Sequence, residues 1–121
     1  MATKFTQEEK FVRCVHDGSY AYDEFREVVK AAAAYCRECG ARNLLLDFSR
    51  AQGDLSFYDR YKLGEESPAL VGFGLRVAVY GRPDQIHPEK IGELVARNRG
   101  AAVRVFADPA KAEAWIRSEG S

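Results

Sequence analysis

Five charged or hydroxyl-bearing residues stand at or just after the ends of predicted strands, where they could bind a small polar ligand. They are Asp47, Ser49, Arg50, Arg82 and Asp108. Ligands of open α/β sheets usually bind outside the carboxyl ends of the parallel strands, so we expect any ligand site at this edge. Each residue taken singly also fits an ordinary turn or helix cap, and for single residues we prefer that interpretation.

A second chemical signal is the Cys-Arg-Glu-Cys run at residues 36–39, which has the Cys-x-x-Cys spacing of redox sites and of half of many zinc sites. It falls in the last turn of a predicted helix, where the helix dipole disfavours a thiolate. Cys14 and His16 could complete a zinc set, but helix and strand lengths place Cys36 and His16 roughly 20 Å and 7 Å below the turn at Gly18. We therefore expect structural thiols, with no metal and no cofactor.

These residues are positioned by four predicted strands. Leu44, Leu45 and Leu46 follow one another without a polar face, which is typical of an inner strand of a parallel sheet. Alternation and β-branching predict the other strands. The four strands cover residues 11–18, 41–49, 75–81 and 102–107.

Four helices are predicted between and after the strands. The first carries an apolar stripe of Phe25, Val28, Val29, Ala32, Ala33 and Cys36 and ends at Gly40. A short second helix begins at Ser56, which forms a capping-box pattern with Asp59, and ends before Pro68. The third has Pro88 in its first turn and ends at Gly100. The last is capped by Asp108 and carries Ala112, Trp115 and Ile116 on one side.

The strand and helix order is βαβαβαβα, which predicts an α/β fold with a mainly parallel four-stranded sheet and right-handed crossovers. We expect a flexible N-terminal segment over residues 1–10 and a single domain over residues 11–121. A chain of this length can fold around one core without a metal or a disulfide.

The two faces of the predicted sheet differ in polarity. One face is dry and is formed by Leu44, Leu46, Phe48, Leu75, Val77, Val79, Val103 and Val105. The other mixes apolar and charged groups, so we expect the helices mostly on the dry face. The candidate interface residues on the mixed face are Leu45, Arg76, Tyr80, Arg104 and Phe106. A partly uncovered face of this kind predicts a homodimer.

Charge and hydropathy exclude several classes of function. The 18 basic and 18 acidic side chains leave no net charge and are interleaved, so no nucleic-acid footprint is visible. Apolar runs are far shorter than the roughly 20 residues that span a bilayer, and no export signal opens the chain. Three cysteines without an export signal favour reduced thiols. We expect a cytoplasmic protein that does not insert into membranes.

Several segments resemble a SpoIIAA-like protein of the STAS/SEC14-like group. They are Leu44–Phe48, Arg76–Gly81, Asn98–Gly100, Val103–Phe106 and the Ala-Glu-Ala-Trp-Ile run at residues 112–116. The resemblance covers roughly residues 11–117 and implies a fold of four successive βα turns. The group consists mostly of regulatory or binding modules.

In anti-sigma-factor antagonists of this group, a turn after the central strand carries a phosphorylated serine at a helix start. The corresponding residues 53–58 read Gly-Asp-Leu-Ser-Phe-Tyr, which makes Ser56 the candidate phosphosite. The aromatic residues Phe57 and Tyr58 replace the glycine of the family's turn. The resemblance thus implies a regulatory protein partner, while leaving the phosphoswitch open.

Two functional hypotheses follow from these observations. The first is a non-catalytic regulatory or binding module of SpoIIAA-like type that acts through protein contacts. The alternative is a small apolar-ligand or lipid-binding protein of SEC14-like character, suggested by the relationship and by the aromatics Phe57, Tyr58, Tyr61 and Phe73. No catalytic arrangement of serine, histidine and aspartate can be assembled from motif spacing, so we do not expect an enzyme.

Overall fold

The computed structural model describes residues 2–53, 55–72, 74–86 and 89–118. The chain begins with two strands, β1 (Ala2–Gln7) and β2 (Val12–Asp17). It then alternates helix and strand as α1 (Tyr22–Cys39), β3 (Asn43–Asp47), α2 (Phe57–Val71), β4 (Arg76–Tyr80), the 3₁₀ helix η1 (Pro83–Gln85), α3 (Ile91–Asn98), β5 (Ala102–Phe106) and α4 (Pro109–Arg117). The predicted α/β class and the order of the βα repeats are confirmed.

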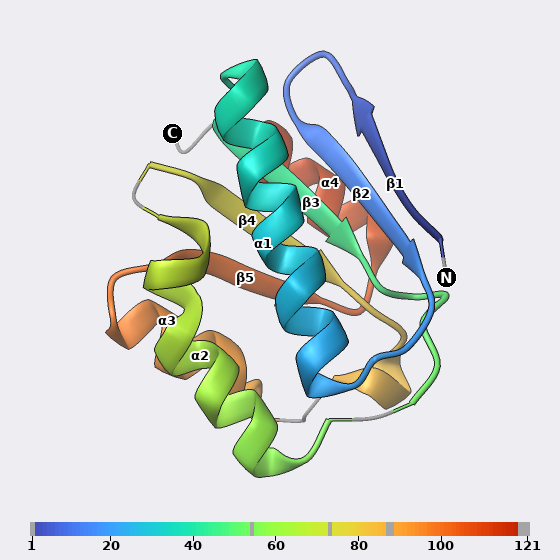
Figure 1. The fold of residues 1–121 in the computed structure, drawn as a ribbon, viewed down its shortest axis with the longest axis vertical. Helices are drawn as coiled ribbons and strands as arrows, with labels where there is room; N and C mark the ends of the chain where they lie inside the picture. The colour runs from blue at the N-terminus through green and yellow to red at the C-terminus, as the bar shows by residue number, and fades with distance from the viewer. Residues whose placement is uncertain (1, 54, 73, 87–88, 119–121) are drawn as a thin grey trace.

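The strands form one sheet in the order β1-β2-β3-β4-β5, in which β1 is antiparallel to β2 and the other neighbours are parallel. Each crossover from β2 onward passes to the next strand in the same direction. Right-handed crossovers of this kind place all their helices on one face. Figure 1 shows this arrangement, with α1, α2 and α3 in front of the sheet and α4 behind it.

The main core lies between the sheet and the three front helices. All eight residues predicted for the dry face belong to it, seven of them buried and Val105 packed against its edge. Helix α1 contributes the predicted stripe, in which Val28, Val29, Ala32, Ala33 and Cys36 are buried. It ends at Gly40, which adopts the left-handed conformation with φ 77°. The alternation of apolar residues therefore predicted the core face of the sheet correctly.

The N-terminal segment, predicted to be flexible, forms the edge strand β1 instead. Phe5 of β1 stacks on Tyr35 of α1 with ring centres 4.8 Å apart. Thr3, on the same side of the strand, contacts His16 of β2. Partial burial of one aromatic ring and a ladder to β2 supply the contacts that fix this segment, so the sheet has five strands and not four.

Helix α2 continues past Pro68, where the prediction ended it. A proline inside a helix removes one backbone hydrogen bond and crowds the preceding turn. Leu70 and Val71 follow Pro68 and are buried in the core. Their burial stabilises the last turn of α2 and offsets the cost of the proline. The predicted position of Pro88 in the first turn of the third helix lies outside the described residues, and α3 begins at Ile91.

The mixed face of the sheet is covered in part by α4, as a sheet with most of its helices on the dry face predicts, but α4 covers one of the candidate interface residues. Leu45 and Ala78 pack with Ala112 and Ile116 of α4 in a second core cluster, and Leu45 is buried. Leu45 therefore cannot contribute to an exposed interface. Trp115 is half-buried at the rim of this cluster.

The rim of the mixed face remains available to solvent. Tyr80 and Phe106 are half-buried there, and Arg104 is exposed. The Arg76 guanidinium stacks 4.0 Å from the centre of the Trp115 ring and donates to the Trp115 carbonyl oxygen at 3.1 Å. A homodimer stays a prediction that now rests on this rim of the partly covered face. None of the helices in the described ranges is long and apolar enough to cross a bilayer.

Candidate functional site

The carboxyl edge of the sheet brings together three of the five predicted ligand residues. One carboxylate oxygen of Asp47, at the end of β3, accepts hydrogen bonds from the Ser49 amide at 2.9 Å and the Ser49 hydroxyl at 2.6 Å. Arg82, just after β4, donates through Nη1 to the carbonyl oxygens of Ser49 and Ala51. These groups hold the loop after β3 against the loop after β4.

Gln85 completes this network, and the sequence did not predict a role for it. Its Nε2 donates to the carbonyl oxygens of Phe48 at 3.0 Å and Ala51 at 3.1 Å, and its Oε1 accepts from the Arg82 amide at 2.6 Å. The side chain is buried. A glutamine that follows an arginine by a few positions carries no recognisable signal, because only the fold places it under a loop from a much earlier part of the chain.

The remaining two predicted ligand residues lie apart from this network. Arg50 is exposed. Asp108 caps α4 by accepting a hydrogen bond from the Ala110 amide at 2.9 Å, as its position before Pro109 predicted. The structure therefore gives Asp47, Ser49, Arg82 and Asp108 the turn and cap roles that favour these residue types.

A hydroxyl, an imidazole and a carboxylate form a chain at the amino end of α1. His16 Nδ1 lies 2.9 Å from Thr3 Oγ1, and His16 Nε2 lies 2.8 Å from a carboxylate oxygen of Glu24. Because a carboxylate only accepts, Nε2 carries a proton and donates to Glu24, while Nδ1 makes the contact with the Thr3 hydroxyl. The imidazole has no exposed surface. A ring without exposed surface joins β1, β2 and α1 and does not face a substrate.

The Glu24 carboxylate has a second role at the start of α1. The same oxygen accepts a hydrogen bond from the Ser19 amide at 2.9 Å. This backbone hydrogen bond, more than the contact with His16, lowers the pKa of Glu24 from its usual value near 4.5. Gly18 is required beside the pair, since a Cβ atom there would lie 2.6 Å from Glu24 Oε2 and 2.9 Å from His16 Nε2.

The cysteines have the environment of structural thiols. Cys14 and Cys36 are buried and Cys39 is exposed. Burial raises the pKa of Cys14 to about 12 and that of Cys36 to about 11, so both stay protonated at neutral pH. Within the described ranges, no three histidine, cysteine, aspartate or glutamate side chains are grouped so that they could hold a metal ion.

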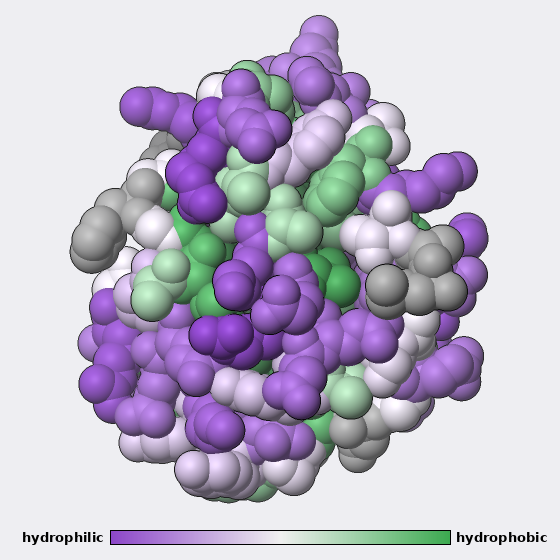
Figure 2. Space-filling model, viewed as in Figure 1, coloured by the Kyte–Doolittle hydropathy of each residue, from purple (hydrophilic) through white to green (hydrophobic). Residues whose placement is uncertain are grey.

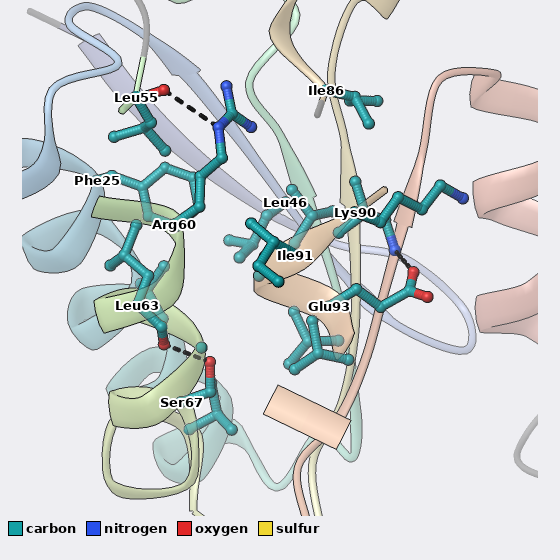
Figure 3. A pocket seen from close by; sticks show the side chains of 18 of the residues that line it. Phe25, Leu46, Leu55, Arg60, Leu63, Ser67, Ile86, Lys90, Ile91 and Glu93 are labelled. Atoms are coloured by element: carbon teal, nitrogen blue, oxygen red, sulfur yellow. Dashed lines mark hydrogen bonds between the residues drawn. The ribbon is translucent and has the colours of Figure 1, made fainter. Parts of the chain in front are cut away.

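A cavity of about 90 Å³ lies between the sheet and the front helices. Figure 3 shows Phe25, Leu46, Leu63 and Ile91 around this space, between α2 and the strands. Its floor is formed by side chains of the dry face of the sheet, including Val77 and Val103. The sequence predicted these residues as core, and alternation alone could not show that they leave a space.

The first turns of α2 form an exposed aromatic surface. Phe57, Tyr58 and Tyr61 are 55%, 66% and 37% exposed. Among the described residues, Leu94 of α3 is the one other large hydrophobic side chain that is exposed. Figure 2 shows that hydrophilic residues dominate the face of the molecule that carries α1, α2 and α3, with hydrophobic ones gathered near its middle. We call Ser56, Phe57, Tyr58 and Tyr61 the α2 surface.

Hydrogen bonds and a stacked cation fix the backbone of the α2 surface. The Ser56 hydroxyl accepts from the Asp59 amide at 3.0 Å, and the Asp59 carboxylate accepts from the Ser56 amide at 3.4 Å, which is the predicted capping box. Lys62 lies with its ammonium 5.4 Å from the Tyr58 ring centre and 4.4 Å from that of Tyr22 in α1. The aromatic rings therefore project from an anchored helix start.

Comparisons with known proteins give matches among solved structures alone. No protein-family model matches the chain, and no curated protein matches it. Among solved structures, the chain is similar to the anti-sigma factor antagonist SpoIIAA in its unphosphorylated form. The match has 13% sequence identity and a TM-score of 0.48, and it covers 99% of this chain and 100% of that one.

Proposed function

We propose that the protein is a non-catalytic binding module that contacts a partner protein through the α2 surface. The observation that supports this most directly is the exposure of three aromatic side chains within five residues of one helix, at Phe57, Tyr58 and Tyr61. Aromatic side chains are enriched at protein interfaces and often supply most of the binding free energy. Exposure of such side chains to water is unfavourable unless a partner covers them.

The anchoring of α2 supports the same proposal. A contact surface binds more tightly when its side chains are already ordered, because less conformational entropy is lost on association. The capping box at Ser56 fixes the start of the helix, and the Glu66 carboxylate of α2 accepts hydrogen bonds from Tyr22 at 2.6 Å and Arg26 at 3.3 Å of α1. The three aromatic rings thus stand on a helix that is held against α1.

Ser56 provides a means to regulate this contact. Its side chain is exposed and lies in the same turn as Phe57 and Tyr58. A phosphate on Ser56 would place negative charge at a helix amino end, which the helix dipole favours, and beside the rings that the partner would cover. We therefore propose Ser56 as the phosphorylation site of the module. We also propose that the module works in the cytoplasm, where its three free thiols would stay reduced.

Site-specific photocrosslinking in cells of the source organism tests the contact. A benzophenone amino acid is placed at position 58 or 61, with matched controls at Arg37 and Lys111, which are exposed on other helices. We expect one partner band from positions 58 and 61 and none from the controls. The Phe57→Ser variant should weaken that band without changing the circular dichroism, since Phe57 is mostly exposed.

Two outcomes would contradict this function. Equal labelling from positions 58 and 111 would show that the capture is non-specific. A band that persists at full strength in the Phe57→Ser, Tyr61→Ser double variant would show that the aromatic rings do not bind the partner. Sedimentation of the purified protein distinguishes a second copy of this chain from a different partner, because only self-association raises the mass of the purified protein.

A further inference from the structure

The cavity beneath α2 and α3 has apolar walls. Its lining includes Leu46, Val77, Val79, Val103 and Val105 from the sheet, with Phe25, Leu63, Val71 and Ile91 from the helices. In Figure 3 the side chain of Lys90 extends away from this space, while Ile91 lies against it. The walls are therefore made almost entirely of aliphatic and aromatic carbon.

The polar groups at the edge of the cavity are already bound within the protein. The Ser67 hydroxyl donates to the Leu63 carbonyl oxygen at 2.8 Å. The Glu93 carboxylate accepts from the Val105 amide at 2.7 Å, and Arg60 Nε donates to the Leu55 carbonyl oxygen at 3.1 Å. In the part of the chain that the structure describes, no buried side-chain nitrogen or oxygen lacks a hydrogen-bond partner.

These two observations determine which molecules the cavity can hold. A buried water needs two to four polar partners, and a polar ligand group that finds none loses its hydrogen bonds to water without replacing them. Apolar cavities of about 150 Å³ stay dry and bind benzene, and a space of about 90 Å³ is of the same order. An apolar molecule has no hydrogen bonds to water to give up on entering, and its entry removes apolar surface from water.

We propose that this cavity is a binding site for a small uncharged apolar molecule, such as a single aromatic ring or a short alkyl chain. The site lies on the inner side of α2 and does not depend on a partner at the α2 surface. A charged molecule of the same size would find neither a free counter-charge inside nor water to solvate it.

Toluene and benzoate provide a matched pair of probes, because they share the ring and differ in the charged group. Methyl-labelled protein is titrated with each probe and followed by nuclear magnetic resonance. We expect toluene to shift the methyl signals of Val77, Val103 and Leu46, which line the cavity, and benzoate to leave them unchanged.

Two variants of Ser67 provide the structural control. Ser67→Leu extends a side chain into the cavity from α2 and should weaken toluene binding by about tenfold or more. Ser67→Ala removes the hydroxyl without filling the space and should keep the affinity. Circular dichroism checks that each variant folds, and Val105→Ile, which adds one methyl group to the lining, replaces Ser67→Leu if that variant is unfolded.

The proposal is overturned if the Val77 and Val103 methyl signals stay constant up to the solubility limit of toluene. It is equally overturned if benzoate binds as well as toluene, since the walls would then accept charge. Shifts confined to the methyl signals of Leu94, which is exposed on α3, would place toluene on the molecular surface and not in the cavity. Toluene binding that is retained at full strength in a folded Ser67→Leu variant would also place the ligand outside the cavity.

Discussion

His16 and Glu24 connect the interior of the sheet to the start of α1 through a contact of 2.8 Å between Nε2 and a carboxylate oxygen. The imidazole is fully buried, and the Glu24 side chain reaches it from the first turn of the helix. The same carboxylate oxygen holds the Ser19 amide. One carboxylate therefore fixes the turn between β2 and α1 and gives Nε2 of a buried ring its hydrogen-bond partner.

The Glu24 contact should make stability depend on pH. The folded-state pKa of Glu24 is lowered, chiefly by the Ser19 amide, so its contribution is present above the unfolded pKa near 4.5 and is lost as the pH falls through the folded value. We expect Glu24→Gln to lower the urea midpoint at about pH 6 and to flatten its decline toward about pH 3.5.

Glu27→Gln is the matched control for Glu24→Gln. Glu27 lies on the same helix and is 66% exposed, with Arg26 and Lys30 at 3.6 and 3.8 Å. Exposed ion pairs of this kind contribute little, so its pH profile should follow the wild type. Parallel profiles for Glu24→Gln and the wild type would mean that the carboxylate does not act as described.

The three thiols should differ sharply in reactivity. Cys39 is exposed, whereas burial raises the pKa of Cys14 to about 12 and of Cys36 to about 11. Because the thiolate is the reactive form, a disulfide reagent at about pH 8 should modify one thiol quickly and the other two only after unfolding. In Cys39→Ser the fast phase should vanish. Two fast thiols in the wild type would instead favour a reactive Cys-x-x-Cys pair.

The features that could be predicted from the sequence are those in which one periodicity covers a whole element. The apolar stripe of α1 from Phe25 to Cys36 and the alternating apolar residues of the strands could be predicted because buried positions recur at the regular spacing of a helix or a strand. Caps were predictable for a related reason: Ser56 and Asp108 act on amides two or three residues away. In both cases the relevant partner is local or regularly spaced.

Features that depend on a distant segment were not predictable. Strand β1 is fixed by the stacking of Phe5 on Tyr35, thirty residues later, and its own sequence shows only a weak alternation. Strand parity places Leu45 among the interface candidates because it does not reveal which part of the mixed face the last helix covers. In the candidate site, Gln85 and His16 reach partners on other elements, and the cavity results from how well α2 and α3 fill the dry face.

The crossing of α2 and α3 should tolerate no side chain at Gly64. A Cβ atom there would lie 2.7 Å from the Val95 Cβ and 2.8 Å from the Gly92 carbonyl oxygen, so the helices would have to move apart. We expect Gly64→Ala to lower the free energy of unfolding by about 1 to 3 kcal/mol, although alanine favours a helix by up to about 1 kcal/mol over glycine. Urea denaturation followed by circular dichroism measures this loss.

Gly92→Ala separates the contact from the general effect of replacing a helical glycine. Its Cβ atom would lie 3.4 Å from the Arg60 carbonyl oxygen, which is close to ordinary van der Waals contact. This variant should be near neutral or slightly stabilised. If Gly64→Ala were as stable as Gly92→Ala, the two helices would not approach each other as closely at Gly64 as described.

Glu93 should protect the free edge of the sheet. β5 is the last strand in the sheet order, and the Val105 amide on its outer side donates to the Glu93 carboxylate of α3 at 2.7 Å. Unpaired amides on an edge strand can form hydrogen bonds with a strand of another chain. A carboxylate that accepts a hydrogen bond from such an amide prevents that pairing. Glu93→Ala should leave the Val105 amide without this partner, at a cost of about 1 to 3 kcal/mol in the free energy of unfolding.

Amide hydrogen exchange at Val105 measures this protection directly. We expect Glu93→Ala to speed exchange at Val105 by about tenfold or more and to increase self-association in sedimentation, because the edge amide becomes available. Glu93→Gln keeps an oxygen acceptor at the same position and removes the charge, so it should retain most of the protection. Slow exchange at Val105 in Glu93→Ala would show that the helix itself, and not the carboxylate, shields the strand. Fast exchange in Glu93→Gln would show that the negative charge, and not the oxygen acceptor, is what the edge requires.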